Sequence, residues 1–263
     1  MKYYVVTDIH GFLLYLERAL EEKGFFNESE PYKLIVCGDL LDRGKEAREL
    51  VDFMLRLADE DKLIYVYGNH EELFYSCLQE IARGEIHTIS CGSSHHYRNG
   101  TWDTMLQLSE MSAREAIENP NELVRRVMSS DFYRRLLPMT VDYFETAHYV
   151  FTHGWIPCRR EGFGPFTHYE YDPNWRAQDS DGWHFARWVN GMDMALDKGI
   201  VEPSKTIVCG HWHTSYAHSI YDRIGTEWGD GADYSPFYDN GIIALDSRAV
   251  VSGFLNCIVI EDD

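Results

Sequence analysis

The sequence predicts an α/β fold built around a parallel β-sheet. Short apolar runs recur along the chain, and amphipathic helical patterns separate the first of them. Alternation of strands and helices over short connections indicates a parallel sheet with right-handed crossovers. The chain has 263 residues, of which 44% are apolar, so it can bury the core of one large domain. We therefore expect residues 1–263 to form a single domain.

Three strands and three helices are predicted in the first 82 residues. Each strand is a short apolar run, and each helix has apolar residues three or four positions apart. The first helix is expected to stop at Gly24, because glycine commonly follows the last helical turn. The strands are residues 3–7, 35–37 and 63–67, and the helices are residues 12–20, 50–57 and 71–82.

The rest of the chain is less regular. Residues 84–138 carry helical patterns and are predicted to form a mostly helical insertion. Residues 155–182 are rich in glycine, proline and aromatic residues, Phe163 and Phe166 among them, which favours an ordered, lid-like loop. The other expected elements are strands at 140–146, 148–152, 206–209, 241–245 and 250–260, a helix at 183–196 and an irregular segment at 214–240.

Composition and charge exclude several classes of protein. The net charge of -19 argues against binding a nucleic-acid polymer, because such binding depends on the release of phosphate counterions. No run of eighteen apolar residues exists, so we expect no membrane span. The six cysteines show no C-x-x-C spacing, and we expect no secretory leader, because the first residues read as a strand. We therefore expect a cytoplasmic protein.

Five apolar runs end in residues that can hold a metal ion. Each run would deliver its last side chains to the carboxyl edge of a sheet, which is where ligands bind in open α/β folds. One such residue alone could be a simple cap, since Asp and Asn favour these positions. Five together indicate a metal site. The segments are Asp8-Ile9-His10-Gly11, Gly38 to Gly44, Gly68-Asn69-His70-Glu71, His153-Gly154 and Gly210-His211-Trp212-His213.

In order, these segments spell D-x-H, G-D-x-x-D-R-G, G-N-H-E, H-G and G-H-x-H. With these motifs the chain resembles the calcineurin-like metallophosphoesterase superfamily. Segments 38–44 and 68–71 resemble its phosphoprotein-phosphatase branch, which includes bacterial and phage Ser/Thr phosphatases and diadenosine tetraphosphatases. The motifs run from residue 8 to 213 and so span most of the chain. The resemblance implies a four-layer sandwich of two mixed β-sheets flanked by helices.

The resemblance also implies two divalent metal ions. A two-metal site needs a bridging carboxylate, and Asp39 on the central strand is the natural bridge. Manganese is our first expectation, with iron, zinc or nickel as alternatives, because geometry and supply decide among them. The implied ligands are Asp8, His10, Asp39 and His213 for one ion, and Asp39, Asn69, His153 and His211 for the other.

The same resemblance assigns catalytic and substrate-binding roles. His70 would be the general acid, with Asp42 as its orienting partner. Arg43 would bind two phosphoryl oxygens with its planar guanidinium, and Asn69 would also contact the substrate. We choose Arg187 as a second arginine for phosphate. The alternatives to it are Arg159, Arg160 and Arg176.

We therefore predict a dinuclear-metal phosphoesterase that hydrolyses phosphomonoesters by attack of a metal-bridging hydroxide on phosphorus. A Ser/Thr protein phosphatase is the first interpretation. A dinucleoside polyphosphate (diadenosine tetraphosphate) hydrolase is the alternative, and a non-catalytic metal-site scaffold is an alternative of another class. The expected partner is a phosphorylated substrate, either a phosphoprotein or a nucleotide, and the oligomeric state is left open.

Overall fold

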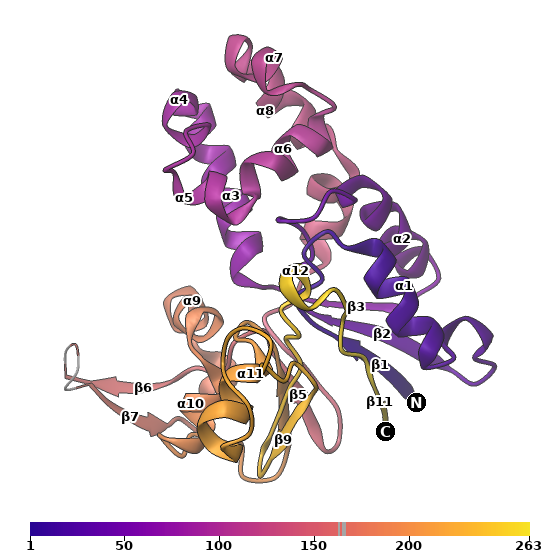
Figure 1. Ribbon diagram of the computed structural model, residues 1–263, viewed down its shortest axis with the longest axis vertical. Helices are drawn as coiled ribbons and strands as arrows, with labels where there is room; N and C mark the ends of the chain where they lie inside the picture. The colour runs from indigo at the N-terminus through magenta and orange to yellow at the C-terminus, as the bar shows by residue number, and fades with distance from the viewer. Residues whose placement is uncertain (163, 165–166) are drawn as a thin grey trace.

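The computed structural model describes residues 1–162, 164 and 167–263. Two mixed sheets form its centre (Figure 1). In the first sheet, with order β11-β1-β2-β3, only β11 runs antiparallel to its neighbour. In the second, with order β4-β5-β8-β10-β9, the three central strands are parallel. The first sheet comprises β1 (Lys2–Val6), β2 (Tyr32–Cys37), β3 (Leu63–Val66) and β11 (Ile258–Glu261), and the second comprises β4 (Phe144–Glu145), β5 (Tyr149–Phe151), β8 (Thr206–Cys209), β9 (Phe237–Asp239) and β10 (Ile242–Ala244).

Side-chain alternation along the strands creates the layers of the molecule. On β1, Tyr3 and Val5 pack in a core between the two sheets, where they join Phe151 and Val208 of the second sheet. The intervening residues, such as Val6, face the helices outside the first sheet. Successive side chains of a strand point to opposite faces, so both sheets are buried on both sides. The predicted arrangement of two sheets flanked by helices is confirmed.

Helices cover the outer face of each sheet. Helix α1 (Leu13–Glu22) and α2 (Ala47–Asp59) cover the first sheet with buried residues such as Leu16 and Leu50. Helices α9 (Ser180–Trp188) and α10 (Gly191–Leu196) cover the second, where Trp183 and Met192 contribute to its outer core. A short 3₁₀ turn, η1 (Phe25–Asn27), follows α1 at Gly24, whose φ is 81°.

Helices fill the segment expected to be a helical insertion. They gather beyond the carboxyl ends of the first sheet (Figure 1). Their buried residues, including Trp102 and Phe132, belong to the same core as α1 and α2. The single-domain organisation itself stays a prediction. Helix α3 (Asn69–Ala82) precedes this segment, and the elements within it are α4 (Ile86–Ile89), α5 (His95–Asn99), α6 (Thr101–Ser109), α7 (Ala113–Glu118), α8 (Pro120–Ser129), η2 (Phe132–Leu136) and η3 (Leu137–Met139).

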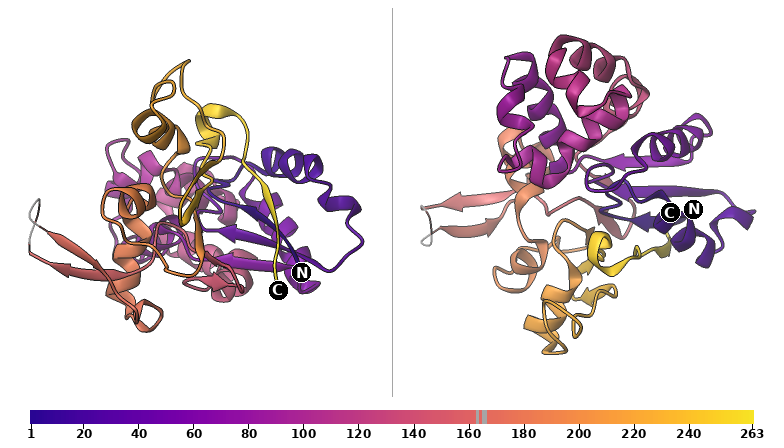
Figure 2. Two further views of the ribbon diagram at one scale, coloured as in Figure 1. Left: turned by 90° about the horizontal axis from the view of Figure 1, so that it is seen from below. Right: turned by 45° about the horizontal axis from the view of Figure 1, so that its top comes forward.

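Residues 155–182 are not the loop that the sequence suggested. They contain an antiparallel hairpin, β6 (Cys158–Glu161) and β7 (His168–Tyr171), which projects from the molecule (Figures 1 and 2), and the short turn η5 (Trp175–Ala177). The hairpin was missed because its residues are mostly exposed and lack apolar alternation. Phe163 and Phe166, part of the expected lid, lie outside the described residues.

Three further boundaries were wrong. The helix expected at 183–196 is two helices, because the Asn190 side chain caps α10 by accepting a hydrogen bond from Met192 N. The strand expected at 250–260 begins instead with a helical turn, α12 (Ala249–Ser252), which Gly253 ends at a φ of 77°. Segment 214–240 contains α11 (Thr214–Ala217), η6 (His218–Asp222) and β9.

Among the described residues, no helix is both long and apolar enough to cross a membrane.

Candidate functional site

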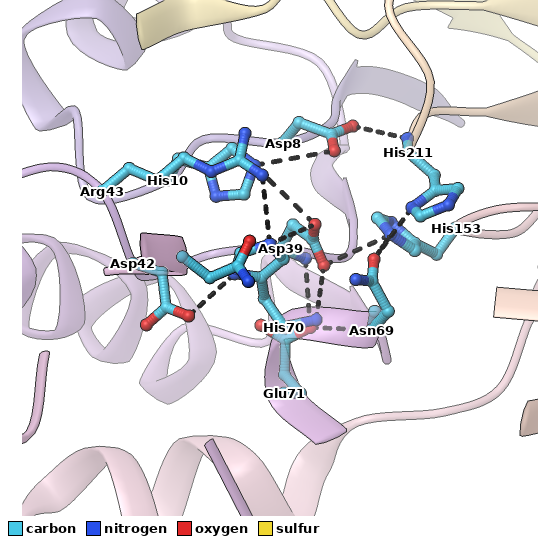
Figure 3. Close-up of polar contacts among 12 residues, drawn as sticks. Asp8, His10, Asp39, Asp42, Arg43, Asn69, His70, Glu71, His153 and His211 are labelled. Atoms are coloured by element: carbon cyan, nitrogen blue, oxygen red, sulfur yellow. Dashed lines mark hydrogen bonds and ion pairs between the residues drawn. The ribbon is translucent and has the colours of Figure 1, made fainter. Parts of the chain in front are cut away.

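The site lies where parallel strands of both sheets end. The loops after β1 and β2 carry Asp8 with His10 and then Asp39, and α3, which follows β3, begins with Asn69 and His70. The loops after β5 and β8 carry His153 and His211. Figure 3 shows the side chains of these loops pointing toward one another. The structure thus brings together the ends of all five runs that the sequence singled out.

The backbone of these loops is held in an unusual conformation. Asp8, His10, Asp39 and His211 all have positive φ, between 50° and 68°. Non-glycine residues rarely adopt this region, and such strain is typical of functional sites. Hydrogen bonds between loops maintain it. His10 N donates to Asp39 O at 3.0 Å, and His211 N donates to the Asp8 carboxylate at 3.0 Å.

Glycine is needed where two of these loops meet. Gly38 has a φ of 81°, and a Cβ at this position would lie 2.5 Å from His153 Nδ1. A Cβ on Gly68 would collide with the Asp39 backbone and carboxylate. The absence of side chains therefore allows the second and third strand ends to approach closely.

Asp39 occupies the centre of the cluster. Its Oδ1 lies 3.2 Å from His153 Nε2, whereas its Oδ2 lies 3.7 Å from His10 Nε2. Two groups of side chains could hold a metal ion, and Asp39 belongs to both. One contains His10 and His70, and the other contains His153 and His211. This is the arrangement required of a carboxylate shared by two cations.

Backbone carbonyls orient the histidine rings. Nδ1 of His10 donates to Leu41 O at 3.1 Å, and Nδ1 of His153 donates to Cys37 O at 2.8 Å. In each ring this leaves the Nε2 lone pair directed at the cluster. The same second hydrogen bond fixes the tautomer of most metal-bound histidines. Burial lowers the pKa of His211 to about 3, so this ring is also neutral and able to bind a metal.

The donor set of the cluster fits cations. Asn69 Oδ1 lies 2.7 Å from His153 Nε2, so two atoms that both carry lone pairs face each other. The Asp8 and Asp39 carboxylates are each only 2% exposed. Burial raises the pKa of Asp39 well above its ordinary value, the effect expected for a carboxylate without a compensating charge. Bound cations would compensate this charge and separate the facing lone pairs.

His213 lies in neither group, although the sequence placed it around the first ion. Its Nδ1 donates to Ser215 Oγ at 2.9 Å, and its ring packs against Trp228 with centroids 4.6 Å apart. The positive φ of His211 and the start of α11 at Thr214 turn the chain between the two histidines. The side chains of His213 and His211 therefore point in different directions, and the geometry gives no support to the predicted role of His213 as a metal ligand.

His70 and Asp42 form the pair that the sequence suggested. His70 Nδ1 donates to Asp42 Oδ2 at 2.7 Å, and Arg43 Nη2 lies 3.3 Å from His70 Nε2. Among the described residues, no carboxylate lies within ion-pair distance of Arg43. Its guanidinium is therefore available to an anionic ligand.

Two threonines that were missed from the sequence orient Asp42. Thr101 donates to Asp42 Oδ2 at 2.7 Å, and Thr104 donates to Oδ1 at 2.6 Å. Both threonines are fully buried and belong to α6 of the helical insertion. Their spacing of three places both hydroxyls on one face of the helix, but no sequence pattern shows that this face meets Asp42.

Glu71 is a second residue with an underestimated role. The sequence showed Glu71 only as the last residue of the G-N-H-E motif, without a metal-binding or catalytic role. Instead its buried carboxylate accepts hydrogen bonds from the backbone N–H groups of Asp39, Leu40 and Gly68 and from the Tyr65 hydroxyl, at 2.6–3.0 Å. Glu71 thus joins the loops after β2 and β3 and fixes the position of Asp39 relative to α3.

Arg187, predicted to bind phosphate, is already paired with acidic side chains. Its Nε donates to Glu72 at 2.8 Å, and its Nη1 lies 3.4 Å from Asp142. Two carboxylates thus already neutralise this buried guanidinium. The alternatives Arg159 and Arg176 pair with acidic residues, and Arg160 lies over the Phe185 ring.

Asp246 follows β10, a sixth parallel strand end at the same edge. The sequence signal was present, because the apolar run 242–245 ends at Asp246 as the other runs end at their predicted metal ligands. Asp246 Oδ1 accepts a hydrogen bond from Arg248 N at 2.7 Å. Burial, followed by the charge of Asp8, raises the pKa of Asp246 to about 7. This carboxyl group lines a hollow beside the cluster.

Residues 1–230 match the family described as calcineurin-like phosphoesterase. A bis(5'-nucleosyl)-tetraphosphatase PrpE [asymmetrical] of Bacillus velezensis is 25% identical over 139 residues, which are 51% of each chain. A symmetrical bis(5'-nucleosyl)-tetraphosphatase of Buchnera aphidicola is 40% identical over 27% of this chain and 24% of its own. The alignments thus span about half and about a quarter of these relatives. A cold-active protein-tyrosine phosphatase of Shewanella aligns with a TM-score of 0.49 at 15% identity, over 99% of this chain and 75% of its own.

Replacing Asp39 tests the bridge between the two groups. We expect Asp39→Asn to remove both metal equivalents, because the shared negative charge is lost while side-chain volume is kept. Elemental analysis of the purified protein measures this directly. The control is Asp52→Asn on the exposed surface of α2, which should bind as much metal as wild type. Two retained equivalents in Asp39→Asn would rule out the bridge.

Replacing Thr104 tests the orientation of Asp42. Thr104→Val leaves one oxygen of a buried carboxylate without its donor, which costs about 1–3 kcal/mol of stability. We also expect a lower kcat on esters with poor leaving groups. Denaturant unfolding and steady-state kinetics measure the two effects. Thr88→Val, at an exposed position on α4, is the matched control. A variant with wild-type stability and kcat would contradict this role of Thr104.

Proposed function

The chain belongs to the calcineurin-like phosphoesterase family of metal-dependent phosphoester hydrolases, and we propose that its substrate is a dinucleoside polyphosphate. The observation that carries the hydrolytic assignment is the position of Asp39 between two groups of metal-binding side chains. The substrate is supported by the relatives, which are named bis(5'-nucleosyl)-tetraphosphatases. An arginine-lined hollow beside the cluster also favours a substrate with several phosphoryl groups.

The residues of the cluster would hold two divalent cations. Asp8, His10 and Asp39 would bind one, and Asp39, Asn69, His153 and His211 the other. Bound cations would activate water and neutralise charge that develops on phosphoryl oxygens. Manganese as the native metal and the cytoplasm as the location stay proposals. The mixture of carboxylate, amide and imidazole ligands is compatible with manganese, iron, zinc or nickel.

The side chains beside the cluster would position the phosphoryl group and move a proton. Arg43 would bind two phosphoryl oxygens, since its planar guanidinium offers paired donors. His70 would donate a proton from Nε2 to the leaving oxygen, because Asp42 holds Nδ1 at 2.7 Å and so fixes the ring. Thr101 and Thr104 keep Asp42 in place for this task. The site therefore contains the groups required of an active hydrolase, and we do not propose a non-catalytic scaffold.

Protein phosphatase activity, the first interpretation of the sequence, is the second candidate. It is favoured by the motifs at 38–44 and 68–71, which resemble the phosphoprotein-phosphatase branch. Both candidates use the same groups at the cleaved bond. The two candidates differ in the rest of the substrate. For the first candidate it is a polyphosphate chain with nucleosides, and for the second it is a peptide.

A comparison of substrates separates the two candidates. We expect the metal-loaded protein to cleave diadenosine tetraphosphate with a kcat/KM at least tenfold above that for a phosphoserine peptide. Chromatography of the nucleotide products and measurement of released phosphate provide the two rates. A preference for the phosphopeptide would instead favour the protein phosphatase.

Replacement of His70 tests its role as the general acid. We expect His70→Asn to lower kcat by about 10²–10⁴ on an ester with a poor leaving group and by much less on a nitrophenyl ester. The reason is that a leaving group of low pKa needs little protonation. His87→Asn, on the exposed surface of α4, is the control. Equal losses on both esters, or loss of bound metal, would exclude the acid role.

A further inference from the structure

A hollow of about 600 Å³ lies beside the metal-binding cluster, and His211 of the cluster lines it. Arg43 also lines the hollow and contacts His70, so it marks the end nearest to the proposed chemistry. A hollow of this size is in the range of small-molecule sites. The arginines and tryptophans around the hollow belong to neither group of side chains that could hold a metal ion.

Three arginines from distant segments face this hollow. Arg43 follows β2, Arg98 belongs to α5, and Arg248 precedes α12. The chain carries a net charge of -19, yet none of the three has an ion-pair partner among the described residues. Unpaired cations gathered in one concavity create a local positive potential that attracts anions.

The acidic residues of the hollow are already engaged. Asp103 forms an ion pair with Lys45. Asp246 is buried, and its Oδ1 accepts the backbone hydrogen bond from Arg248. The arginine side chains therefore keep their donors for a ligand. Arg43 would act at the cleaved phosphoryl group, which leaves Arg98 and Arg248 for a further one.

The hollow also presents aromatic surface. Trp228 is 51% exposed, and the Arg248 guanidinium lies 4.3 Å from its ring centroid. Trp212 lines the same hollow and is 38% exposed. Exposed indole faces are surfaces on which nucleobases stack, and an adjacent arginine strengthens such stacking.

His213 adds an unused hydrogen-bond acceptor. Ser215 Oγ donates to Glu227 O, so it accepts from His213 Nδ1–H, and His213 Nε2 then carries the lone pair. This buried Nε2 has no hydrogen-bond partner among the described residues, since Glu227 Oε1 is 3.6 Å away. The nitrogen suits a donor such as a ribose hydroxyl or a base amino group, which inorganic phosphate lacks.

We propose that Arg98 and Arg248 form a second phosphate subsite, and that Trp228 and His213 beside it bind the attached nucleoside. The ligand class is a nucleoside carrying at least two phosphoryl groups. This inference rests on the proposed function, since it assigns the part of the substrate that lies beyond the cleaved bond. In this proposal Arg98 and Arg248 bind phosphate in place of Arg187, the residue that the sequence suggested.

Equilibrium binding tests the subsite without requiring turnover. Calorimetric titration of the metal-loaded protein with ADP, pyrophosphate and adenosine compares wild type with Arg98→Ala, Arg248→Met and Trp228→Ala. We expect each arginine variant to raise the Kd for both ADP and pyrophosphate by about tenfold. Trp228→Ala should weaken ADP and adenosine but leave pyrophosphate within twofold.

The matched control is Arg134→Ala, which removes one exposed arginine far from the hollow in sequence and should change no Kd by more than twofold. The subsite is overturned if Arg98→Ala and Arg248→Met also change the Kd of ADP by less than twofold. Equal weakening of ADP and pyrophosphate by Trp228→Ala would overturn the nucleoside assignment. Failure of wild type to cleave diadenosine tetraphosphate would instead refute the proposed function, because the binding assay needs no cleavage.

Discussion

The carboxylate of Asp39 is buried between two sets of imidazoles, and much of the surrounding structure holds it there. Its two oxygens face different histidines, at 3.2 Å and 3.7 Å. A buried carboxylate is unfavourable unless cations or hydrogen bonds compensate it. The His70 backbone N–H supplies one such hydrogen bond at 2.9 Å. The cations of a metal-dependent hydrolase would supply the remaining compensation.

Placing Asp39 there depends on both sheets at once. Parallel strands of each sheet end at a common edge, and the loops are joined by hydrogen bonds rather than by their own local preferences. Glu71 ties the loop of Asp39 to the start of α3, and Gly38 lets His153 approach from the second sheet. The positive φ values of Asp8, His10, Asp39 and His211 persist because these hydrogen bonds between loops hold the backbone in place.

The helical insertion links the chemistry to substrate choice. Helix α6 supplies the two threonines that hold Asp42, and the preceding α5 supplies Arg98 to the hollow. One insertion thus contacts both the His70–Asp42 pair and the surface where a substrate would extend beyond the cleaved bond. Changes in this segment can therefore alter this surface while the side chains that could hold metal ions, carried by the strand ends, stay the same.

Local patterns in the sequence determined most strands of the two sheets, most of the helices and the convergence of the five polar strand ends. An apolar run that ends in a polar residue defines a strand end whatever surrounds it, and parallel strands share one edge. The same pattern at Asp246 could have been recognised. Tertiary structure alone decided the direction of His213, the pairing of Arg187 with Glu72, and the contacts of Thr101, Thr104 and Glu71. These depend on which surfaces of distant segments meet, and no spacing within one segment encodes that.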